Sequence, residues 1–442
     1  MGKGIAVFGT GYLGATHAAC MAELGHQVIG IDVDASKLAK LAGGEAPFWE
    51  PGLNEVLEAN LAAGRLRFSS SYEEAAEFAD VHFVAVATPQ KRGEFAADLT
   101  YVDSVIDKLS PLLKEPAVIF GKSTVPVGTA SRLSERIRNL APAGDAVELA
   151  WNPEFLREGY AVKDTLHPDR IVLGVNANGA GRAEEVAREV YSSVIAEGVP
   201  FLVTDLETAE LVKTAANAFL ATKISFINAM AEMCEAAGAD VTELADAIGH
   251  DARIGRRFLN AGIGFGGGCL PKDIRAFMAR AGELGANQAL TFLREVDSIN
   301  MRRRTRVMEL AREVAGGSLI GATVAILGAA FKPDSDDIRD SPALNIAGQI
   351  QLQGASVTVY DPKAIDNSRR LFPTLEYADS ALEACAGADV TMVLTEWDEF
   401  RQLEPSHLNA VVRHRRMIDG RNCLDQSKWR SAGWEYRGMG RR

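Results

Sequence analysis

Residues 4–34, GIAVFGTGYLGATHAACMAELGHQVIGIDVD, decide the fold of this chain. The apolar run 4–9 predicts a buried strand, and residues 10–25 predict a turn followed by a helix. A second apolar run at 26–34 predicts another strand. A strand, a helix and a strand in this order form a βαβ unit, in which the two strands lie parallel.

The turn GTGYLG at 9–14 fits the pattern GxGxxG. In this pattern Gly9 permits a tight turn, Gly11 lets a pyrophosphate approach the backbone, and Gly14 lets the helix pack on the strand. Asp32 ends the second strand, where a carboxylate can accept both ribose hydroxyls and repel a 2′-phosphate. The unit therefore predicts NAD rather than NADP. The alternative, a glycine-rich turn with a surface aspartate, leaves the flanking strands and helix unexplained.

Further short apolar runs alternate with helical segments, as buried parallel strands do. These runs lie at 81–89, 116–126, 147–154 and 170–175. Residues 206–238 contain no proline and no internal glycine, which predicts one long helix. A second βαβ half then follows, with apolar runs at 321–331 and 355–362 around a helix near 342–353.

The sequence thus predicts an α/β fold with two Rossmann-like doubly wound domains, joined by a helical connector with a long central helix. We place an NAD-binding domain at 1–205, a helical central domain at 206–317 and a C-terminal Rossmann-like domain at 318–442. The basic stretch 301–314 is expected to be the solvated face of a connector helix.

The composition excludes several classes of function. The chain has 442 residues, a formal charge of −12 and a pI near 5.2, which argue against nucleic-acid or anionic-membrane partners. The cysteines are odd in number and lack CxxC spacing, so neither a disulfide framework nor a zinc site is predicted. The scattered histidines suggest no metal. The cysteine pattern favours a reducing cytoplasm, and we expect neither a signal peptide nor a membrane span.

The stretch GFGGGCLPKD at 264–273 contains a single thiol, Cys269, which four glycines precede. Glycines let a ligand approach the main chain, and Pro271 suits the first turn of a helix. Cys269 would then lie at the positive end of that helix beside Lys272, which favours the thiolate. Asp273 would lie one turn away. A buried apolar cysteine is the alternative, but the glycines favour a nucleophile.

Three other segments carry candidate chemistry. Lys213 and Asn217 begin a stripe at helical spacing that continues through Leu220, Ile224 and Asn228 and either faces a cleft or turns outward. Glu154 and Glu158 are four residues apart in WNPEFLREG. They could orient water or accept sugar hydroxyls, or they could be two solvated glutamates at a helix start.

Thr124 of STVPVGT follows a predicted strand, at the sheet edge where ligands of doubly wound folds bind.

Taken together, seven ordered motifs resemble the UDP-glucose 6-dehydrogenase family of nucleotide-sugar dehydrogenases, within the UDP-glucose/GDP-mannose dehydrogenase group. The resemblance covers nearly the whole chain. The motifs are GTGYLG, STVPVGT, NPEFLREG, ELVKTAANAFLATKISFINAMAEMCE, RFLNAGIGFGGGCLPKD, FKPDSDDIRDSP and DGRN.

The resemblance implies a two-step oxidation of UDP-glucose to UDP-glucuronate that produces two NADH and supplies polysaccharide biosynthesis. Cys269 would form a thiohemiacetal and then a thioester, because the second hydride must leave from a tetrahedral adduct. Lys213 and Asn217 would stabilise the oxyanion. Asp273 would act with water in proton transfer and Glu154 would assist thioester hydrolysis, although the base at each step stays open.

The resemblance also implies binding residues. Thr124 would order the active-site water. The residues implied for NAD are Gly9, Gly11, Tyr12, Leu13, Gly14, Asp32, Lys37, Thr88, Thr124, Glu158, Lys272 and Arg339. The residues implied for the UDP-sugar are Glu154, Phe155, Leu156, Arg157, Glu158, Lys213, Asn217, Arg253, Phe258, Leu259, Asn260, Ala261, Gly262, Gly266, Lys332 and Arg421.

The resemblance further implies a homodimer formed through the central domain, with the C-terminal domain binding the UDP-sugar. Arg253 would cross the interface to the neighbour's substrate. Two positions depart from the family pattern: Trp49 replaces a smaller ring in WEPGL, and Gly268 stands where serine is also frequent. Neither removes a group on which the mechanism depends.

Three rival functions remain at this stage. The same chemistry on GDP-mannose or UDP-N-acetylmannosamine differs only in the sugar and base pocket. A non-catalytic NAD-binding module has no need of Cys269, Lys213 or Asp273. A one-step alcohol dehydrogenase of the 6-phosphogluconate type would produce one NADH and would be indifferent to Cys269→Ser.

Overall fold

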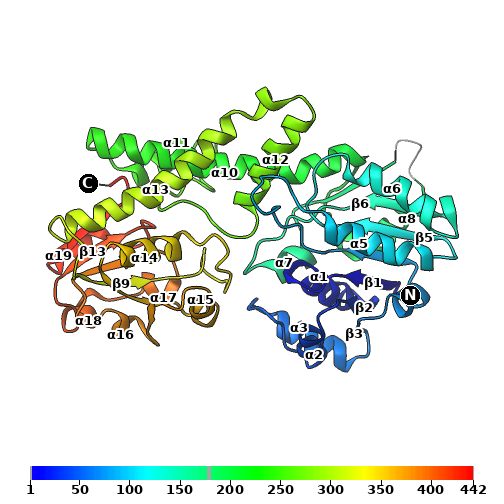
Figure 1. Cartoon of the computed structure of the whole chain (residues 1–442), viewed down its shortest axis with the longest axis horizontal. Helices are drawn as coiled ribbons and strands as arrows, with labels where there is room; N and C mark the ends of the chain where they lie inside the picture. The colour runs from blue at the N-terminus through cyan, green and yellow to red at the C-terminus, as the bar shows by residue number, and fades with distance from the viewer. Residues whose placement is uncertain (1, 177–180, 442) are drawn as a thin grey trace. The chain divides into compact units, whose positions relative to one another are not determined.

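The chain forms two compact units, each built around its own sheet (Figure 1). The computed structural model describes residues 2–176 and 181–441. Unit 1 comprises Met1–Ala216 and Arg275–Gly285, and unit 2 comprises Asn217–Ile274 and Ala286–Arg442. The predicted α/β class with two doubly wound sheets is confirmed. The three-domain division with boundaries at 205 and 317 stays a prediction.

Unit 1 contains an eight-stranded sheet in the order β3-β2-β1-β4-β5-β6-β7-β8. Its strands are β1 (Gly4–Phe8), β2 (Gln27–Ile31), β3 (Leu66–Ser69), β4 (Val81–Val84), β5 (Ala117–Gly121), β6 (Val147–Trp151), β7 (Ile171–Val175) and β8 (Phe201–Asp205). All neighbours from β3 to β6 pair in parallel, with β1 and β2 in the register Gly4↔Gln27.

The parallel prediction is wrong at one pair of strands. β7 meets β6 antiparallel through Trp151 and Gly174, and β8 then pairs in parallel with β7. An apolar run reports burial on both faces of a sheet but carries no information about strand direction. Strand β8 itself is not predicted. It is an edge strand with exposed residues such as Leu202, so it lacks the apolar signal.

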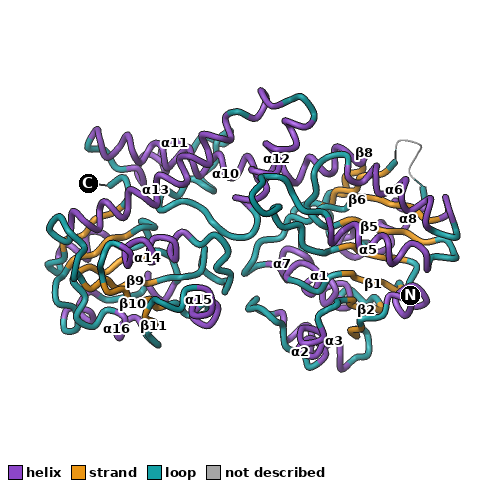
Figure 2. Tube along the Cα trace, in the orientation of Figure 1, coloured by secondary structure: helices purple, strands orange, loops and turns teal. Residues whose placement is uncertain are grey.

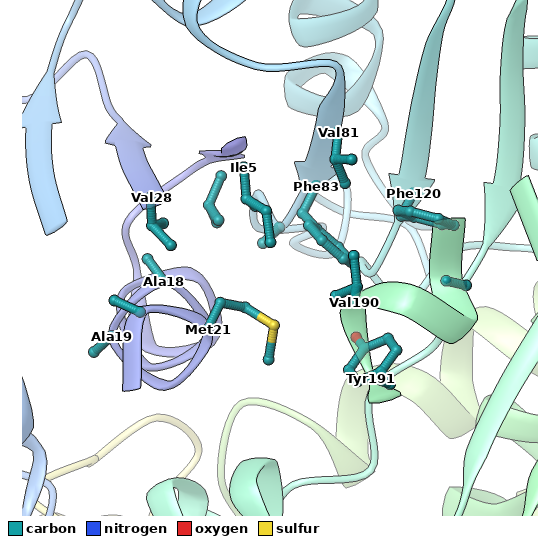
Figure 3. Close-up of a cluster of buried hydrophobic side chains, with 14 of the residues drawn as sticks. Ile5, Ala18, Ala19, Met21, Val28, Val81, Phe83, Phe120, Val190 and Tyr191 are labelled. Carbon is teal, nitrogen blue, oxygen red and sulfur yellow. The ribbon is translucent and has the colours of Figure 1, made fainter. Parts of the chain in front are cut away.

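Two hydrophobic cores cover the two faces of this sheet. Ile5 and Val7 of β1 join one core, whereas Ala6 and Phe8 join the other, because successive side chains of a strand point to opposite faces. In the first core the α1 residue Met21 lies beside Ile5 and Phe83 (Figure 3). Burial on both faces explains why the strands are continuously apolar.

Helices surround the sheet of unit 1 on both faces. They are α1 (Tyr12–Glu23), α2 (Ala35–Ala42), α3 (Leu53–Ala62), α4 (Tyr72–Phe78), α5 (Thr100–Leu109), α6 (Thr129–Leu140), α7 (Ala161–Leu166), α8 (Arg182–Val190) and α9 (Ser192–Ala196), with 3-10 turns at Ser110–Leu112 and Gly144–Ala146. Residues of α1 and α8 contribute to the first core, and residues of α5 and α6 contribute to the second.

Two helices have residues in both units. The predicted long helix is confirmed as α10 (Leu206–Ala237), and α12 (Leu270–Glu283) begins directly after Cys269. Two segments that carry predicted site residues are loops. They are residues 152–157 after β6 and the stretch that precedes α12 (Figure 2).

Unit 2 contains a six-stranded parallel sheet in the order β11-β10-β9-β12-β13-β14. Its strands are β9 (Thr323–Leu327), β10 (Ser356–Tyr360), β11 (Glu376–Tyr377), β12 (Val390–Val393), β13 (Arg416–Asp419) and β14 (Glu435–Gly438). Its helices are α11 (Val241–Gly249), α13 (Phe292–Val314), α14 (Pro342–Leu352), α15 (Ile365–Leu371), α16 (Ala381–Ala384), α17 (Asp398–Arg401), α18 (Pro405–Asn409) and α19 (Gln426–Ser431), with a 3-10 turn at Asn287–Leu290.

The expectation that 301–314 is a solvated face is wrong for part of α13. Arg303 and Arg304 are 0% and 3% exposed, whereas the neighbouring Arg302 and Arg306 are partly exposed. A run of charges does not reveal which side chains find buried partners. Among residues 2–176 and 181–441, no helix combines the length and apolar character that a bilayer crossing requires.

Candidate active site

The glycine-rich turn between β1 and α1 has the geometry of a phosphate-binding turn. Gly9 adopts a φ of +89°, and a Cβ atom at Gly14 would lie 1.7 Å from the Gly9 carbonyl oxygen. A Cβ at Gly11 would meet no described atom within 4 Å, so this side of the turn is open. Within the described residues, no side chain caps α1 at Gly11. Open amides at a helix N-terminus fit the pyrophosphate of NAD.

Asp32 at the end of β2 is held in one orientation. Its Oδ2 accepts hydrogen bonds from the Thr10 amide at 2.8 Å and the Thr10 hydroxyl at 2.9 Å. The Lys37 ammonium donates to the same oxygen at 2.9 Å, and the Asp34 amide donates to Oδ1 at 3.1 Å. Burial raises the pKa of Asp32, but the bonds from Lys37, Thr10 and Asp34 outweigh it and leave the pKa below its ordinary value. An oriented, ionised carboxylate fits a ribose diol.

Glu50 joins this turn to a second loop, a role that sequence reasoning missed and for which the motif WEPGL was the only signal. The Tyr12 hydroxyl donates to Glu50 Oε2, which also accepts from the Gly159 amide at 2.6 Å. Glu50 Oε1 accepts from the Ala161 amide at 2.7 Å, at the start of α7. Glu50 is 6% exposed, and burial raises its pKa despite these bonds. The Glu50 carboxylate therefore binds both the glycine-rich turn 9–14, called the cofactor turn below, and the end of the segment 154–159.

The carboxyl ends of β4 and β5 bring two predicted threonines together. The Thr88 hydroxyl donates to the Thr124 carbonyl at 2.7 Å. Thr124 is partly exposed, and Thr88 is buried. The strand-end position predicted for Thr124 is therefore observed, because β5 ends at Gly121.

Lys122 is a buried ammonium at the same edge that sequence reasoning missed. Its Nζ donates to Asn152 Oδ1 at 2.9 Å and lies 3.4 Å from the Tyr191 hydroxyl. Burial lowers the pKa of Lys122 to about 8, and the nearby Glu154 charge opposes this effect. The only sequence signal was its place directly before STVPVGT.

Glu154 and Lys213 form a buried ion pair in unit 1. Lys213 Nζ lies 2.8 Å from Glu154 Oε1, and the two side chains are 7% and 11% exposed. Glu154 Oε2 also accepts from the Leu156 amide at 2.8 Å. Lys213 therefore faces inward, and Glu154 supplies the anionic partner that its burial requires.

The segment 152–157 after β6 is a loop and not the helix start that one interpretation of its glutamates assumed. Glu158 is 8% exposed. The Arg157 guanidinium points to Asp164, with Nη2 and Oδ1 2.6 Å apart, and the Arg170 guanidinium lies 3.9 Å from the centre of the Phe155 ring. Both glutamates are thus held by the fold and are not solvated.

Unit 2 carries the predicted nucleophile. Cys269 is exposed and directly precedes α12, and the Asp273 amide donates to its carbonyl at 2.9 Å. Asp273 is 2% exposed. Its Oδ1 lies 2.5 Å from Lys272 Nζ, and its Oδ2 accepts from Asn217 Nδ2 at 2.7 Å. A thiol at a helix N-terminus, one turn from a buried carboxylate, is suited to nucleophilic chemistry.

The glycines before Cys269 are required by neighbours within unit 2. A Cβ at Gly264, which has a φ of +91°, would lie 2.4 Å from Asn300 Oδ1. At Gly266 it would lie 2.3 Å from the Asp340 carbonyl oxygen, and at Gly267 2.7 Å from the Phe331 ring. The sequence interpretation reserved this space for a ligand. The structure fills it with protein atoms.

The other predicted binding residues of unit 2, Arg339 for NAD and the rest for the UDP-sugar, are spread over several loops. Arg421 donates to the Gly264 carbonyl at 2.9 Å, so it contacts the loop before Cys269. Arg339 pairs with Asp337 at 2.7 Å. Arg253 has an 89% exposed side chain. The remaining positions are the stretch Phe258–Gly262, of which Phe258 is exposed with a φ of +66°, and Lys332 beside the Phe331 ring.

Three domain profiles of the UDP-glucose/GDP-mannose dehydrogenase family match this chain. The NAD binding domain matches residues 3–195, the central domain 207–302, and the UDP binding domain 325–426.

Relatives that match over the full length of the chain support the same family. UDP-glucose 6-dehydrogenase of Rhizobium meliloti is 40% identical over 437 residues, covering 99% of both chains. UDP-glucose 6-dehydrogenase TuaD of Bacillus subtilis is 40% identical, covering 99% of this chain and 93% of the relative. A UDP-glucose dehydrogenase structure from Pyrobaculum islandicum has a TM-score of 0.91 at 36% identity and covers 100% and 98% of the two chains.

Proposed function

This chain belongs to the UDP-glucose/GDP-mannose dehydrogenase family, and we propose that it oxidises UDP-glucose to UDP-glucuronate with two molecules of NAD. The observation that carries the proposal is an exposed thiol, Cys269, at the start of α12 in a chain that matches UDP-glucose 6-dehydrogenases over its full length. Relatives with that name are 39–40% identical, against 27% for a UDP-D-ManNAc dehydrogenase structure from Pyrococcus horikoshii. UDP-glucose is therefore favoured over the sibling substrates.

The chemistry follows from the need to remove four electrons from one carbon atom. NAD supplies the hydride acceptor for each of the two oxidations. Gly9, Gly11 and Asp32 would hold it, since the open turn suits a pyrophosphate and the oriented carboxylate suits a ribose.

Cys269 acts on the aldehyde left by the first oxidation. The thiolate sulfur bonds to the carbonyl carbon, and the oxygen becomes an alkoxide that Lys213 and Asn217 stabilise with a positive charge and an amide donor. Loss of hydride from this thiohemiacetal gives a thioester. Water then attacks the thioester carbon, the carbon–sulfur bond breaks, and the carboxylate leaves while the thiol is regenerated.

Two carboxylates serve the proton transfers. Asp273 holds fixed bonds to Lys272 and Asn217, so it can orient a water or alcohol near the reacting carbon. Glu154, paired with Lys213, would assist the attack of water on the thioester, and Thr124 would order that water. The overall reaction consumes one water and two NAD and releases two NADH, the carboxylate and three protons.

The stoichiometry of NADH tests the reaction class. We expect two NADH per UDP-glucose and a loss of carboxylate formation in Cys269→Ala, with NAD affinity nearly unchanged because the thiol does not belong to the cofactor turn. Cys423→Ser, at a partly exposed thiol outside the proposed site, is the control. A single NADH per substrate, or full product yield from Cys269→Ala, would refute the proposal.

A homodimer is the assembly that the surface of α10 supports. Phe219, Phe226 and Met233, spaced by seven residues, are 66%, 48% and 61% exposed, and such an apolar stripe favours a protein partner. A second copy of the chain is the partner that we propose. We also propose a reducing compartment such as the cytoplasm, because the cysteines are odd in number and lack CxxC spacing.

Two measurements test the dimer. Sedimentation should show a dimer that Phe226→Lys dissociates, while Leu352→Lys, at an 87% exposed residue of α14, leaves it intact. If Arg253 serves the neighbouring protomer, mixing the inactive variants Arg253→Ala and Cys269→Ala should restore about a quarter of the wild-type activity, because half of the randomly exchanged dimers then contain one intact site. A monomeric wild type, or no restoration on mixing, would contradict the dimer or the crossing arginine, respectively.

A further inference from the structure

One face of α13 presents three buried polar side chains to the loop before Cys269. Asn300, Arg303 and Arg304 are 0%, 0% and 3% exposed. Their spacing of three and four residues places them on the same side of the helix. Residues 262–268, called the nucleophile loop below, belong to unit 2, as do these three residues.

The Asn300 side-chain amide hydrogen-bonds to the middle of the nucleophile loop through both its oxygen and its nitrogen. Its Oδ1 accepts from the Phe265 amide at 2.7 Å, and its Nδ2 donates to the Phe265 carbonyl at 3.0 Å. Both bonds are buried. A side chain that donates and accepts at a single backbone residue reproduces the pairing of a neighbouring strand, which the loop lacks here.

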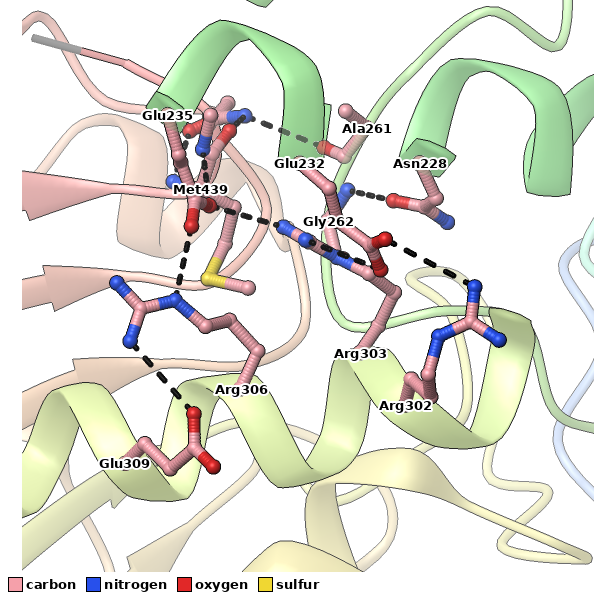
Figure 4. Close-up of polar contacts among 12 residues, drawn as sticks. Asn228, Glu232, Glu235, Ala261, Gly262, Arg302, Arg303, Arg306, Glu309 and Met439 are labelled. Carbon is pink, nitrogen blue, oxygen red and sulfur yellow. Dashed lines mark hydrogen bonds and ion pairs between the residues drawn. The ribbon is translucent and has the colours of Figure 1, made fainter. Parts of the chain in front are cut away.

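Arg303 and Asn228 hold the start of the nucleophile loop from two helices. The Gly262 amide donates to Asn228 Oδ1 at 2.9 Å, and Arg303 Nε donates to the Gly262 carbonyl at 3.2 Å. Figure 4 shows Asn228 of α10 and Arg303 of α13 approaching Gly262 from their respective helices. Glu235 Oε1 lies 3.4 Å from Arg303 Nη2 and balances the buried charge of this arginine.

Two further arginines contact the same stretch. Arg304 Nη2 lies 3.4 Å from the Phe265 carbonyl, and its Nη1 donates to Asp340 Oδ1 at 2.9 Å. Arg421 Nη1 donates to the Gly264 carbonyl at 2.9 Å. Five backbone groups of Gly262, Gly264 and Phe265 thus have side-chain partners, all of them charged or amide groups.

Glycine explains why the loop needs this support. The loop contains glycines at 262, 264, 266, 267 and 268, and glycine loses more backbone freedom on ordering than any other residue. Such a segment does not fix its own conformation. A nucleophile must stay within a fraction of an ångström of its target, since a misplacement of about 1 Å costs roughly 100-fold in rate.

We propose that Asn300 and Arg304 are positioning residues that hold the nucleophile loop so that Cys269 meets the substrate carbon. This inference rests on the proposed function for the role of the thiol. The ordering of the loop is a separate property that can be measured without turnover.

The central variant is Asn300→Ala, which removes both bonds to Phe265 without adding a charge. Asn300→Asp keeps the acceptor for the Phe265 amide and loses the donor, beside the Arg304 guanidinium. Arg304→Lys keeps the charge near Asp340 and loses the second nitrogen that reaches the Phe265 carbonyl. Arg302→Ala is the matched control, because Arg302 is a partly exposed arginine of the same helix that pairs with Glu295 at 2.8 Å.

Three readouts separate positioning from general loss of structure. Hydrogen exchange at the amides of Gly262, Phe265 and Gly267 should be about tenfold faster or more in Asn300→Ala, the factor expected from the net loss of roughly one to two buried hydrogen bonds. The rate at which iodoacetamide alkylates Cys269 should differ from the wild-type rate in the same variant that shows faster amide exchange. The kcat should fall about 10- to 100-fold, while KM for NAD stays within about twofold.

The conservative variants keep the test decisive if Asn300→Ala does not fold. Asn300→Asp and Arg304→Lys should give smaller changes in the same three readouts, and Arg302→Ala should match the wild type in all of them. Unchanged loop exchange in the folded Asn300 variants overturns the proposal. Faster exchange with wild-type kcat also overturns it. Full turnover by Cys269→Ala instead refutes the proposed function and leaves the loop-exchange result standing.

Discussion

Asp32 and Asp361 follow equivalent strands of the two sheets, yet their carboxylates have different partners. Asp361 Oδ2 accepts from the amides of Ala329 and Ala330 and from the Trp397 indole, and its Oδ1 accepts two further amides. Its hydrogen-bonding capacity is used within unit 2. Asp32 follows an open GxGxxG turn, which the turn after β9 lacks. We therefore expect the residue chemistry at the strand end, and not the fold, to select the dinucleotide site.

This difference predicts the effect of removing the Asp32 carboxylate. Asp32→Ala should weaken NAD binding by about 1.5–3 kcal/mol, the usual worth of a hydrogen bond to a charged group. Isothermal titration measures the affinity. Asp34→Asn is the control, because Asp34 caps α2 and an asparagine keeps that cap. Equal NAD affinity in Asp32→Ala and wild type would contradict the proposed pocket.

Lys122 predicts a pH dependence of stability. Its pKa falls from 10.5 in the unfolded chain to about 8 in the fold, so between these values the unfolded chain binds more protons. Stability from this group therefore rises with pH, by roughly 1.5 kcal/mol between pH 8 and pH 9.5. Urea unfolding of wild type and Lys122→Met at both pH values isolates the contribution, because the other groups cancel in the difference. A difference that is constant or falls with pH would be inconsistent with a depressed pKa.

At the scale of elements, loops in both units are held by buried side chains from elsewhere. In unit 1, Glu50 caps the start of α7 and binds Tyr12 of the cofactor turn. In unit 2, Asn300 and Arg303 of α13 bind the loop before Cys269. Strands and helices fix these supporting side chains, and the loops that carry chemistry take their shape from them. Side chains of α13 can thus order a loop of glycines.

Removing the Glu50 carboxylate should weaken both segments that it binds. Glu50→Ala leaves the Gly159 and Ala161 amides without their acceptor, so it should lower the free energy of unfolding by about 2–4 kcal/mol. It should also raise KM for both substrates, because the turn and the segment 154–159 lose a shared anchor. Glu50→Gln should be intermediate, since one amide oxygen remains. Urea unfolding and steady-state kinetics measure these effects, with the exposed Glu45→Ala as control. Wild-type stability in Glu50→Ala would show that the carboxylate does not anchor the two segments.

At the scale of the whole molecule, each unit has its own sheet and its own buried strands. We expect NAD to stabilise unit 1 in particular, because the glycine-rich turn and Asp32 belong to it. At 100 times its dissociation constant, NAD should stabilise unit 1 by about 2.7 kcal/mol, which slows exchange of its most protected amides about 100-fold.

Hydrogen exchange compares β1 and β4 with β9 and β12 in the presence and absence of NAD. The strands of unit 1 should gain the larger protection, and Asp32→Ala should lose that gain at the same NAD concentration. Equal slowing in both sheets would instead mean that the chain unfolds as one cooperative body.

The sequence predicted the elements that depend only on residues close together in the chain. The GxGxxG turn, the long helix α10, the second βαβ half and the start of α12 after Cys269 all follow from patterns within a short stretch of chain. The outward or inward rotation of Lys213 could not be predicted, because its partner Glu154 is distant in sequence. The direction of β7, the burial of Arg303 and Arg304 and the network of Glu50 were missed for the same reason.

Residue type and spacing along the chain were enough to predict an α/β protein with a glycine-rich NAD-binding turn, a single candidate nucleophile and the motifs of a nucleotide-sugar dehydrogenase. The tertiary structure decided what surrounds each group. Burial and hydrogen bonding act between residues that are far apart in sequence, so only the folded chain shows that Asp273 is bonded at both oxygens and that protein atoms crowd the glycines before Cys269.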